Sequence, residues 1–394
     1  MKNKKVNLND ICFFQEGPGV RKHQYCTKGV KLINVSNLVN GEVDLSNSNR
    51  YISQEEAYGR YKHFLIDEGD LIIASSGIKV EYLDKKVAFI KKENLPLCMN
   101  TSTIRFKVKN KNELDILYLS YFLKSKNFKN QISKLITGSA QLNFGGSHLK
   151  KINLFLPELN VQKKVSTLLL LIDNTIKNMQ RKISILEQLT KSLFTRMFGD
   201  IKTNSKNWEV KKIEDCILNN VKNINLKEKG EIAYIDISSI NNKENKILSY
   251  KKYNSISEAP SRAKKILNEN DILISTVRPA LKNIAIFSEK VLELTIASTG
   301  FCILRAKDTI NNKYIFEIIK SDNFTETLIK KQIGANYPAI SDRDIKSIKI
   351  PVPPIELQNK FAERTEKIEK LKFTIWKIIL KVYKILKKKG VENN

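Results

Sequence analysis

The sequence predicts a mixed α/β protein with two duplicated globular domains, separated by two long antiparallel helices that form a coiled coil with pseudo-twofold symmetry. Two observations predict this architecture. Apolar residues recur with a seven-residue period in two long stretches, and the segments that precede these stretches repeat one another. The chain has 394 residues, which is enough for several domains with cores of ordinary size.

The first long stretch runs from Pro157 to Asp200 and is expected to be one helix. A proline suits the first helical turn, and Gly199 suits a left-handed cap at the other end. A rise of 1.5 Å per residue gives a rod on the order of 55 Å long. Apolar residues at spacings of three and four predict a seam that packs along a second helix, interrupted only by Thr190. The seam residues are Ile172, Ile176, Met179, Ile183, Leu186, Leu193 and Met197.

The second long stretch is expected to run from Pro354 to Lys389. Its predicted seam residues are Phe361, Ile368, Leu371, Ile375, Ile378, Val382 and Ile385. The part from Lys372 onward is rich in lysine, and a basic amphipathic helix can bind a membrane surface. The seam favours packing against the first helix instead. Two independent helices, each covering its own domain, are the alternative.

The repeat comprises four pairs of segments in the same order. Residues 31–43 correspond to 233–245, 65–77 to 266–278, 115–128 to 312–324, and 137–165 to 333–361 without a gap. The expected domains are therefore 1–156, a helix at 157–200, a second domain at 201–352 and a helix at 353–394. Residues 201–207 are expected to be a polar linker.

Short apolar runs between turn residues predict the strands of the first domain. We expect strands at Val30–Val35, Leu71–Ala74, Val87–Ile90 and Ile104–Val108, followed by a helix at Leu114–Leu123.

The charge balance points to a polyanionic partner. The chain has 69 Lys and Arg against 41 Asp and Glu, a net charge of +28, which favours nucleic acid. A lysine-rich composition from an AT-rich genome is the alternative. The five cysteines and three histidines show no metal-ligand spacing, so no metal site is expected. The absence of a secretory signal and of a long apolar run predicts a cytoplasmic protein without a membrane partner.

No catalytic motif is found in the sequence. Walker A, GxGxxG and HExxH patterns are missing, and so is the Asp/Asn-Pro-Pro-aromatic tetrad of adenine methyltransferases. Asp70 with Asp84, Lys85 and Lys86 has the spacing of a metal-dependent nuclease, but the repeat carries Ala285 and Ile286 where the second carboxylate should be.

Several residues common to the two repeats are better explained by structure. Asp70 and Asp271 are interpreted as turn residues that bond the backbone before a buried strand. Gly138 and Gly334 suit tight turns, and Gln162 and Gln358 are interpreted as helix caps.

The order of the motifs carries a specific resemblance. Each repeat ends in a proline followed five residues later by glutamine, in LPELNVQ (156–162) and PVPPIELQ (351–358). EGDLIIASSG, its counterpart ENDILISTVRP, the helix end LFTRMFGD and the opening Trp208-Glu-Val-Lys-Lys accompany them. Together these motifs resemble the DNA specificity subunit of type I restriction–modification systems over essentially the whole chain. The first repeat departs from the second in lacking the opening tryptophan and one of the two prolines.

The resemblance implies a non-catalytic subunit that serves DNA methylation and phage defence. Two target-recognition domains would each read half of a split site in double-stranded DNA. The helices would fix their spacing and dock two adenine methyltransferase subunits and the restriction subunits. No cofactor is expected in this chain, because S-adenosylmethionine, ATP and Mg²⁺ would belong to the partner subunits. The alternatives are a specificity-like chain with its own nuclease or methyltransferase activity, and a basic coiled-coil adaptor.

Basic residues in loops beside Gly or Tyr are the predicted DNA contacts. They are Arg21, Lys22, Arg60, Lys62 and Lys79 in the first domain, and Arg262, Lys264, Lys265, Arg278 and Lys282 in the second. Arg can bond guanine through two donors, whereas Lys more often contacts phosphate. A solvated surface charge is the alternative for each of them.

Overall fold

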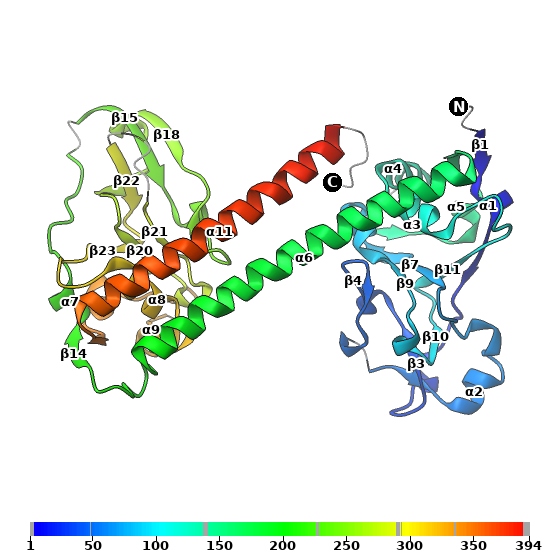
Figure 1. Ribbon diagram of the computed structural model, residues 1–394, viewed down its shortest axis with the longest axis horizontal. Coiled ribbons are helices and arrows are strands. Elements are labelled where there is room, and N and C mark those ends of the chain that lie inside the picture. Colours follow the sequence, from blue (N-terminus) through cyan, green and yellow to red (C-terminus); the bar gives the residue numbers. More distant parts are fainter. Residues whose placement is uncertain are drawn as a thin grey trace. The chain divides into compact units, whose positions relative to one another are not determined.

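The computed structural model describes residues 4–47, 49–136, 141–225, 228–288, 292, 294–334 and 336–388. These residues form two compact units. Unit 1 comprises the described parts of Met1–Gln180 and Trp376–Asn394, and unit 2 comprises those of Arg181–Ile375. Each unit holds one globular domain and part of each long helix, α6 (Leu159–Phe198) and α11 (Ile355–Lys388) (Figure 1).

The part of unit 1 beside α6, called here the framework of unit 1, is a four-stranded antiparallel sheet with short helices (Figure 1). The strand order is β2-β11-β7-β9, with β2 (Cys12–Glu16), β11 (Thr103–Val108), β7 (Leu71–Ala74) and β9 (Val87–Phe89). All four side chains of β7 are fully buried, so this strand lies at the centre of the core. The helices are α1 (Leu8–Ile11), α3 (Ile116–Lys124), α4 (Lys126–Leu135) and α5 (Gly146–Leu149).

The outer lobe of unit 1 is a second sheet with the order β10-β3-β6. It consists of β10 (Leu97–Met99), β3 (Val30–Ile33) and β6 (Tyr51–Ile52), together with helix α2 (Gln54–Tyr58). β10 and β3 are parallel. Leu32 and Cys98 pack in a separate core of this lobe, whereas Ile33 and Met99 pack in the framework core. Successive side chains of a strand point to opposite faces, so the sheet lies between two cores.

Unit 2 repeats this topology. Its framework sheet is β21-β20-β23, and its outer sheet is β18-β15-β22-β19, in which β15 and β22 are again parallel. The strands are β20 (Ile272–Ser275), β21 (Ile284–Ile286), β23 (Phe301–Leu304), β15 (Lys229–Ile235), β18 (Lys251–Ser255), β22 (Leu294–Ser298) and β19 (Ala263–Ile266). The helices are α7 (Ile213–Cys216), α8 (Asn312–Lys320), α9 (Asp322–Lys331) and α10 (Asp342–Lys346). The predicted duplication is confirmed.

Short strand pairs complete both units. β1 (Lys4–Asn7) pairs with β13 (Asn153–Leu156), and β14 (Glu209–Lys212) pairs with β24 (Lys349–Val352), directly before each long helix. The remaining strands are β4 (Leu38–Val39), β5 (Glu42–Val43), β8 (Ser76–Ile78), β12 (Leu142–Asn143), β16 (Ile240–Asn241) and β17 (Lys246–Ile247).

The predicted elements agree with the structure to within a few residues. The four strands expected in the first domain correspond to β3, β7, β9 and β11, and the helix expected at Leu114–Leu123 is α3, which begins after its N-cap Asp115. Gly334 has a φ of +95°, as a tight turn requires. The interpretation of Gly138 lies outside the described residues.

α6 starts later than Pro157 suggested, whereas α11 starts beside Pro354 as expected. The carbonyl of Glu158 accepts the first α6 bonds, so Pro157 precedes the helix instead of opening it. Pro354 takes the position of Glu158 in α11, because its carbonyl accepts from the backbone N–H groups of Leu357 and Gln358. A proline fits there, since its missing N–H would have no helical partner.

The end of α6 is capped by the segment that follows it. Gly199 has a φ of +80°, which confirms the predicted left-handed cap. The ammonium of Lys206 donates to the carbonyls of Arg196 and Met197, and the indole of Trp208 donates to that of Phe198 at 2.9 Å. The predicted polar linker at 201–207 therefore folds back and satisfies the last helical carbonyls.

The α6 seam is buried or half-buried at every predicted position. Its interruption, Thr190, is buried as well because its hydroxyl donates to the carbonyl of Leu186 within the helix. The predicted α6 seam therefore agrees with the burial pattern.

Three predicted α11 seam residues are wrong. Leu371, Ile378 and Ile385 are 56, 43 and 49% exposed, whereas Phe361, Ile368, Ile375 and Val382 are buried or half-buried. The inner stripe is completed instead by the residues one position later, Lys372, Ile379 and Leu386, and by Thr365. The charge of Lys372 concealed this phase. Its aliphatic stem can be buried while its ammonium binds Glu187 and Glu369.

Within unit 2 the two long helices pack in opposite directions. The rings of Phe194 and Phe198 lie 5.4 and 5.3 Å from that of Phe361, with edge-to-face geometry. Towards the other end of this contact, Lys372 lies 3.3 Å from Glu187. Higher residue numbers on α6 contact lower residue numbers on α11, so the two helices are antiparallel in this segment.

A buried glutamine ties each long helix to a short helix of its own unit. In unit 1 the side-chain oxygen of Gln162 accepts from the backbone N–H of Asp115, the N-cap residue of α3, at 3.0 Å. In unit 2 that of Gln358 accepts from the N–H of Asn311, the N-cap residue of α8, at 2.8 Å. Both glutamines are 0% exposed. They clamp two helices together instead of only capping one.

The two turn aspartates also belong to equivalent networks. Asp70 accepts from the backbone N–H of Asp67, and Asp271 accepts from that of Asn268, which confirms the turn interpretation. Each carboxylate also pairs with a buried or nearly buried arginine from the neighbouring strand region. The pairs are Asp70 with Arg105 at 3.1 Å and Asp271 with Arg305 at 2.8 Å.

Replacing Gln358 by alanine is expected to lower the free energy of unfolding of unit 2 by about 2–4 kcal/mol. The substitution leaves the backbone N–H of Asn311 and the carbonyl of Pro353 buried without this partner. Gln188→Ala on the exposed side of α6 is the matched control and should change it by less than about 0.5 kcal/mol. Urea unfolding of both variants measures the difference, and equal midpoints would rule out the clamp.

Candidate nucleic-acid interface

Four of the five predicted contacts in unit 1 lie on its outer lobe. Arg21 and Lys22 are exposed at the start of the short helix Lys22–Gln24, and Arg60 and Lys62 are exposed after α2. The side chain of Gln24 donates to Glu56 at 2.6 Å and to the hydroxyl of Tyr61 at 3.1 Å, so the two segments lie against each other. The lobe therefore brings these four cations onto neighbouring loops.

Lys79 lies elsewhere, after β8 at the edge of the framework.

The carboxylates of the nuclease alternative are Asp70 and Asp84. Asp84, in the short helix after Lys79, is paired with Lys129 at 2.5 Å, while Asp70 is paired with Arg105. The two carboxylates of the nuclease alternative are thus engaged by different cations. In the part of the chain that the structure describes, no group of three His, Cys, Asp or Glu could hold a metal ion.

The predicted contacts of unit 2 divide into exposed and engaged side chains. Arg262 and Lys264 are exposed on either side of Ala263, at the start of β19. β19 is the last strand of the outer sheet, and its outer side is bonded to residues 222–224, so the two cations are available through their side chains and not through a free edge. Arg278 is exposed as well.

Lys265 and Lys282, which stay predicted DNA contacts, also have acidic partners within unit 2. The ammonium of Lys265 binds Asp342 at 2.7 Å and donates to the carbonyl of Phe301. That of Lys282 binds Asp322, and this contact lowers the pKa of the Asp322 carboxyl. Sequence spacing could not show this, since each acidic partner is far along the chain.

Sequence reasoning missed Tyr337. Its side chain is 75% exposed, and the guanidinium of Arg278 lies over its ring at 5.7 Å from the centroid. The available signal in the sequence was the alignment of the two repeats, which places Tyr337 opposite Gln141.

A polar hollow beside the outer lobe of unit 1 was also missed. Its volume is about 520 Å³, and it is lined by Asn34, Val35, Ser36, Asn47, Asn49, Arg50 and Ser102. Arg50 also lies over the ring of Tyr25 at 5.4 Å. The asparagine-rich string before Tyr51 was the available signal.

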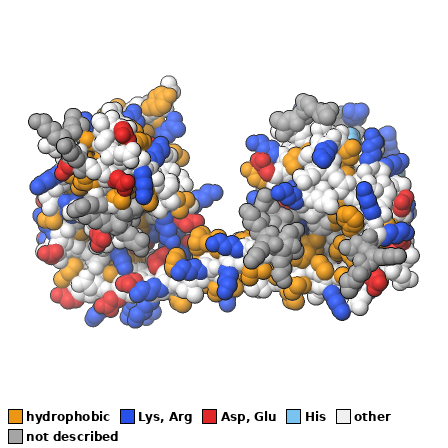
Figure 2. All heavy atoms as spheres, turned by 90° about the horizontal axis from the view of Figure 1, so that it is seen from above, with side chains coloured by type: hydrophobic (Ala, Val, Ile, Leu, Met, Phe, Trp, Pro, Cys, Tyr) orange, Lys and Arg blue, Asp and Glu red, His pale blue; other side chains and the backbone are white. Residues whose placement is uncertain are grey.

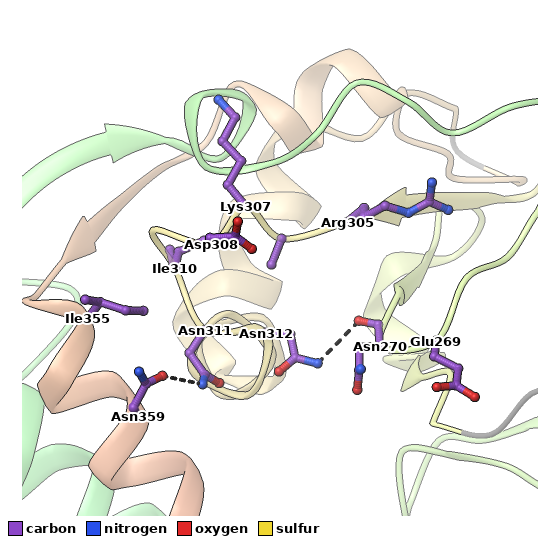
Figure 3. Close-up of a pocket in the computed structure, with 11 residues that line it drawn as sticks. Glu269, Asn270, Arg305, Lys307, Asp308, Ile310, Asn311, Asn312, Ile355 and Asn359 are labelled. Atoms are coloured by element: carbon purple, nitrogen blue, oxygen red, sulfur yellow. Dashed lines mark hydrogen bonds between the residues drawn. The ribbon is translucent and has the colours of Figure 1, made fainter.

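A second hollow in unit 2, of about 320 Å³, lies where α8 and α11 begin (Figure 3). Hydrogen bonds from Asn311 to Asn359 and from Asn312 to the carbonyl of Asn270 cross it. Its polar lining therefore serves the junction that Gln358 clamps.

The cysteines do not provide a reactive thiol in the cores. Burial raises the pKa of Cys12, Cys98 and Cys302 to about 12, so these thiols stay protonated at neutral pH.

Figure 2 shows lysine and arginine side chains spread over the visible face of each unit. No described helix has the length and apolarity needed to cross a membrane.

The chain matches, twice, the family model for the type I restriction modification DNA specificity domain, over residues 1–188 and 205–382. It is 26% identical over 293 residues to a Methanocaldococcus jannaschii protein described as the type I restriction enzyme MjaX specificity subunit, covering 66% of this chain and 63% of that protein. The MjaVIII specificity subunit of the same organism is 25% identical over 208 residues, or 52% of this chain and 47% of that protein. The chain thus spans about half to two thirds of the length of these curated relatives.

The fold has a similar solved structure, that of the type I restriction–modification S subunit from M. genitalium. The alignment covers 100% of this chain and 96% of that one, with a TM-score of 0.58 and 16% identity.

The two matched copies cover nearly the whole chain, and each contains one framework, one outer lobe and part of a long helix. The matched family is defined by DNA specificity and not by a catalytic activity, in agreement with the predicted non-catalytic subunit. The chain belongs to the family of type I restriction–modification DNA specificity domains.

Proposed function

We propose that this chain is the non-catalytic subunit that reads a bipartite DNA site for a type I restriction–modification enzyme. The repeated topology carries this proposal, because each repeat supplies a framework, an outer lobe with basic loops and its own long helix. Residues 1–156 and 201–352 are the two target-recognition domains, and each reads one half of the site. Because the two domains differ in sequence, the two halves of the DNA site can also differ.

The long helices hold the two reading domains apart. α6 has 40 residues, which corresponds to about 60 Å of helix. That length exceeds one turn of B-DNA, about 34–36 Å, so the domains can engage separated groove segments and skip the bases between them. The antiparallel contacts within unit 2 support an antiparallel coiled coil with pseudo-twofold symmetry, formed by residues 157–200 and 353–394.

Exposed apolar side chains on the helices support docking of partner subunits. In unit 1 these include Leu168 and Leu171 on α6, both 58% exposed. In unit 2 they include Ile185 on α6 and Phe373 on α11, at 53 and 50%. Apolar surface of this kind on a long helix is typical of an interaction site. Two adenine methyltransferase subunits and the restriction subunits are the proposed partners.

Catalysis belongs to these partners. The methyltransferase subunits would bind S-adenosylmethionine, and the restriction subunits would use ATP and Mg²⁺. Because the substrate is DNA, the complex would act in the cytoplasm. In this chain, the carboxylates of the nuclease alternative support the fold through Arg105 and Lys129.

Replacing Lys264 by alanine is expected to weaken DNA binding without lowering stability. Loss of one phosphate contact should reduce the slope of log affinity against log salt concentration by about 0.9. Lys265→Ala is the matched comparison, since it should lower the free energy of unfolding by about 1–2 kcal/mol and leave the slope unchanged. Fluorescence anisotropy at several salt concentrations distinguishes the two, and equal slopes for Lys264→Ala and wild type would exclude this contact.

The isolated chain is expected neither to methylate nor to cut DNA. Together with its methyltransferase partner, it should confer adenine methylation at a split motif. Exchange of residues 201–352 for another recognition domain should alter only one half of that motif. Methylome sequencing of expressing cells provides the readout. Methyl transfer by the chain alone, or a change in both halves, would contradict the proposal.

Lengthening both helices by one heptad is expected to lengthen the skipped spacer by roughly three base pairs. Seven residues inserted between Ile176 and Ile183, and seven between Ile378 and Ile385, add about 10 Å while preserving the seam phase. B-DNA rises about 3.4 Å per base pair. A four-residue insertion is the control and should weaken assembly. An unchanged spacer in an active double-insertion variant would contradict the hypothesis that the helices set the distance between the two recognition domains.

A further inference from the structure

Arg278 and Tyr337 form a surface pair that the fold of unit 2 does not need. The tyrosine is 75% exposed, and the arginine is exposed with its guanidinium over the tyrosine ring. Among the described residues, no carboxylate forms an ion pair with Arg278. Arg305, in contrast, is paired with buried Asp271 and supports the framework.

The backbone holds Arg278 in an unfavourable conformation. Its φ of +48° lies in the left-handed region, which residues with a Cβ adopt at a cost of about 1 kcal/mol or more. Its N–H donates to the carbonyl of Pro338 at 2.8 Å, and Val277 bridges to Ala339. Two chain segments therefore fix the arginine beside Tyr337, although a glycine would suit this backbone better.

Unit 1 has a glycine at the equivalent place. The repeat aligns Gly77 with Arg278 and Gln141 with Tyr337. Gly77 has a φ of +71°, and the side-chain oxygen of Gln141 lies 3.9 Å from where its Cβ would be. The same backbone site thus carries Gly and Gln in one unit and Arg and Tyr in the other.

We infer that Arg278 reads a guanine in the half-site recognised by unit 2, and that Tyr337 positions its guanidinium. This inference rests on the proposed function. The planar guanidinium presents two parallel donors, which match the O6 and N7 acceptors of guanine in the major groove. Contact with an aromatic face restricts the plane of the guanidinium, so those donors are aimed before DNA arrives.

A phosphate contact is the competing role, and the side chains favour the base. An arginine can also bind a phosphate through two donors, but a flexible lysine would supply the charge without left-handed strain or an aromatic support. The divergence of this site between the two units also fits sequence reading, because two halves of a split site can differ in their bases.

The test uses the full chain with its methyltransferase and compares Arg278→Gly, Arg278→Lys and Tyr337→Gln. Arg278→Gly reproduces the unit 1 residue and should fold at least as well as wild type, since glycine adopts this φ freely. Arg343→Lys, at an exposed position of α10, is the control for the loss of a guanidinium. Methylome sequencing and binding to oligonucleotides substituted at each position provide the readouts.

Both Arg278 variants should lose roughly 5- to 160-fold discrimination for one G·C pair in one half-site, leaving the other half-site unchanged. Tyr337→Gln should relax the same position less strongly, and Arg343→Lys should relax none. Retained discrimination in Arg278→Gly, or uniform weakening with a smaller salt slope in that variant, would show a phosphate contact and overturn the inference. A wild-type complex that methylates no split motif would instead refute the proposed function.

Discussion

A buried glutamine fixes the start of each long helix against the globular domain that precedes it. Gln162 and Gln358 place a neutral amide between the first turn of a long helix and the N-cap residue of a short one. A buried amide must be hydrogen-bonded, so its partners have little freedom to move. Hydrophobic contact alone would allow the domain to slide on the helix. The amide fixes the position of the domain, and any measurement of distance by the helix depends on that.

The buried ion pairs perform a similar task inside the frameworks. Asp70 and Asp271 join a turn to an arginine on the next strand, so two local features share one carboxylate. The excess of positive charge is therefore not all available to DNA. Lys265, Lys282 and Lys129 bind carboxylates and stabilise the fold, whereas Arg262 and Lys264 have exposed side chains at the start of β19. Cations of the second kind can bind DNA without giving up an ion pair of the fold.

Sequence patterns predicted the features that depend on neighbours along the chain. Central strand β7, the cap at Gly199 and the α6 seam all follow from local periodicity or local backbone geometry. Three residues of the α11 seam, Leu371, Ile378 and Ile385, were each placed one position early, because the charge of Lys372 concealed the phase. The acidic partners of the lysines and the clamp made by Gln358 were not predictable, since they join residues tens of positions apart. Tyr337 was overlooked for the same reason, because only the fold brings it beside Arg278.

The presence of more than one core in each unit has a consequence for evolution. In unit 1, β3 and β10 turn one face to the framework and the other to the outer lobe. Leu32 and Cys98 therefore lie in one core, and Ile33 and Met99 lie in the other. The ring of Phe64 packs against both cores, so only substitutions away from that ring are expected to have nearly additive effects on stability. Mutations that reshape the outer lobe are therefore insulated from the framework that holds the helices. Such a lineage can acquire new sequence preferences by drift and recombination while the framework around its long helices persists.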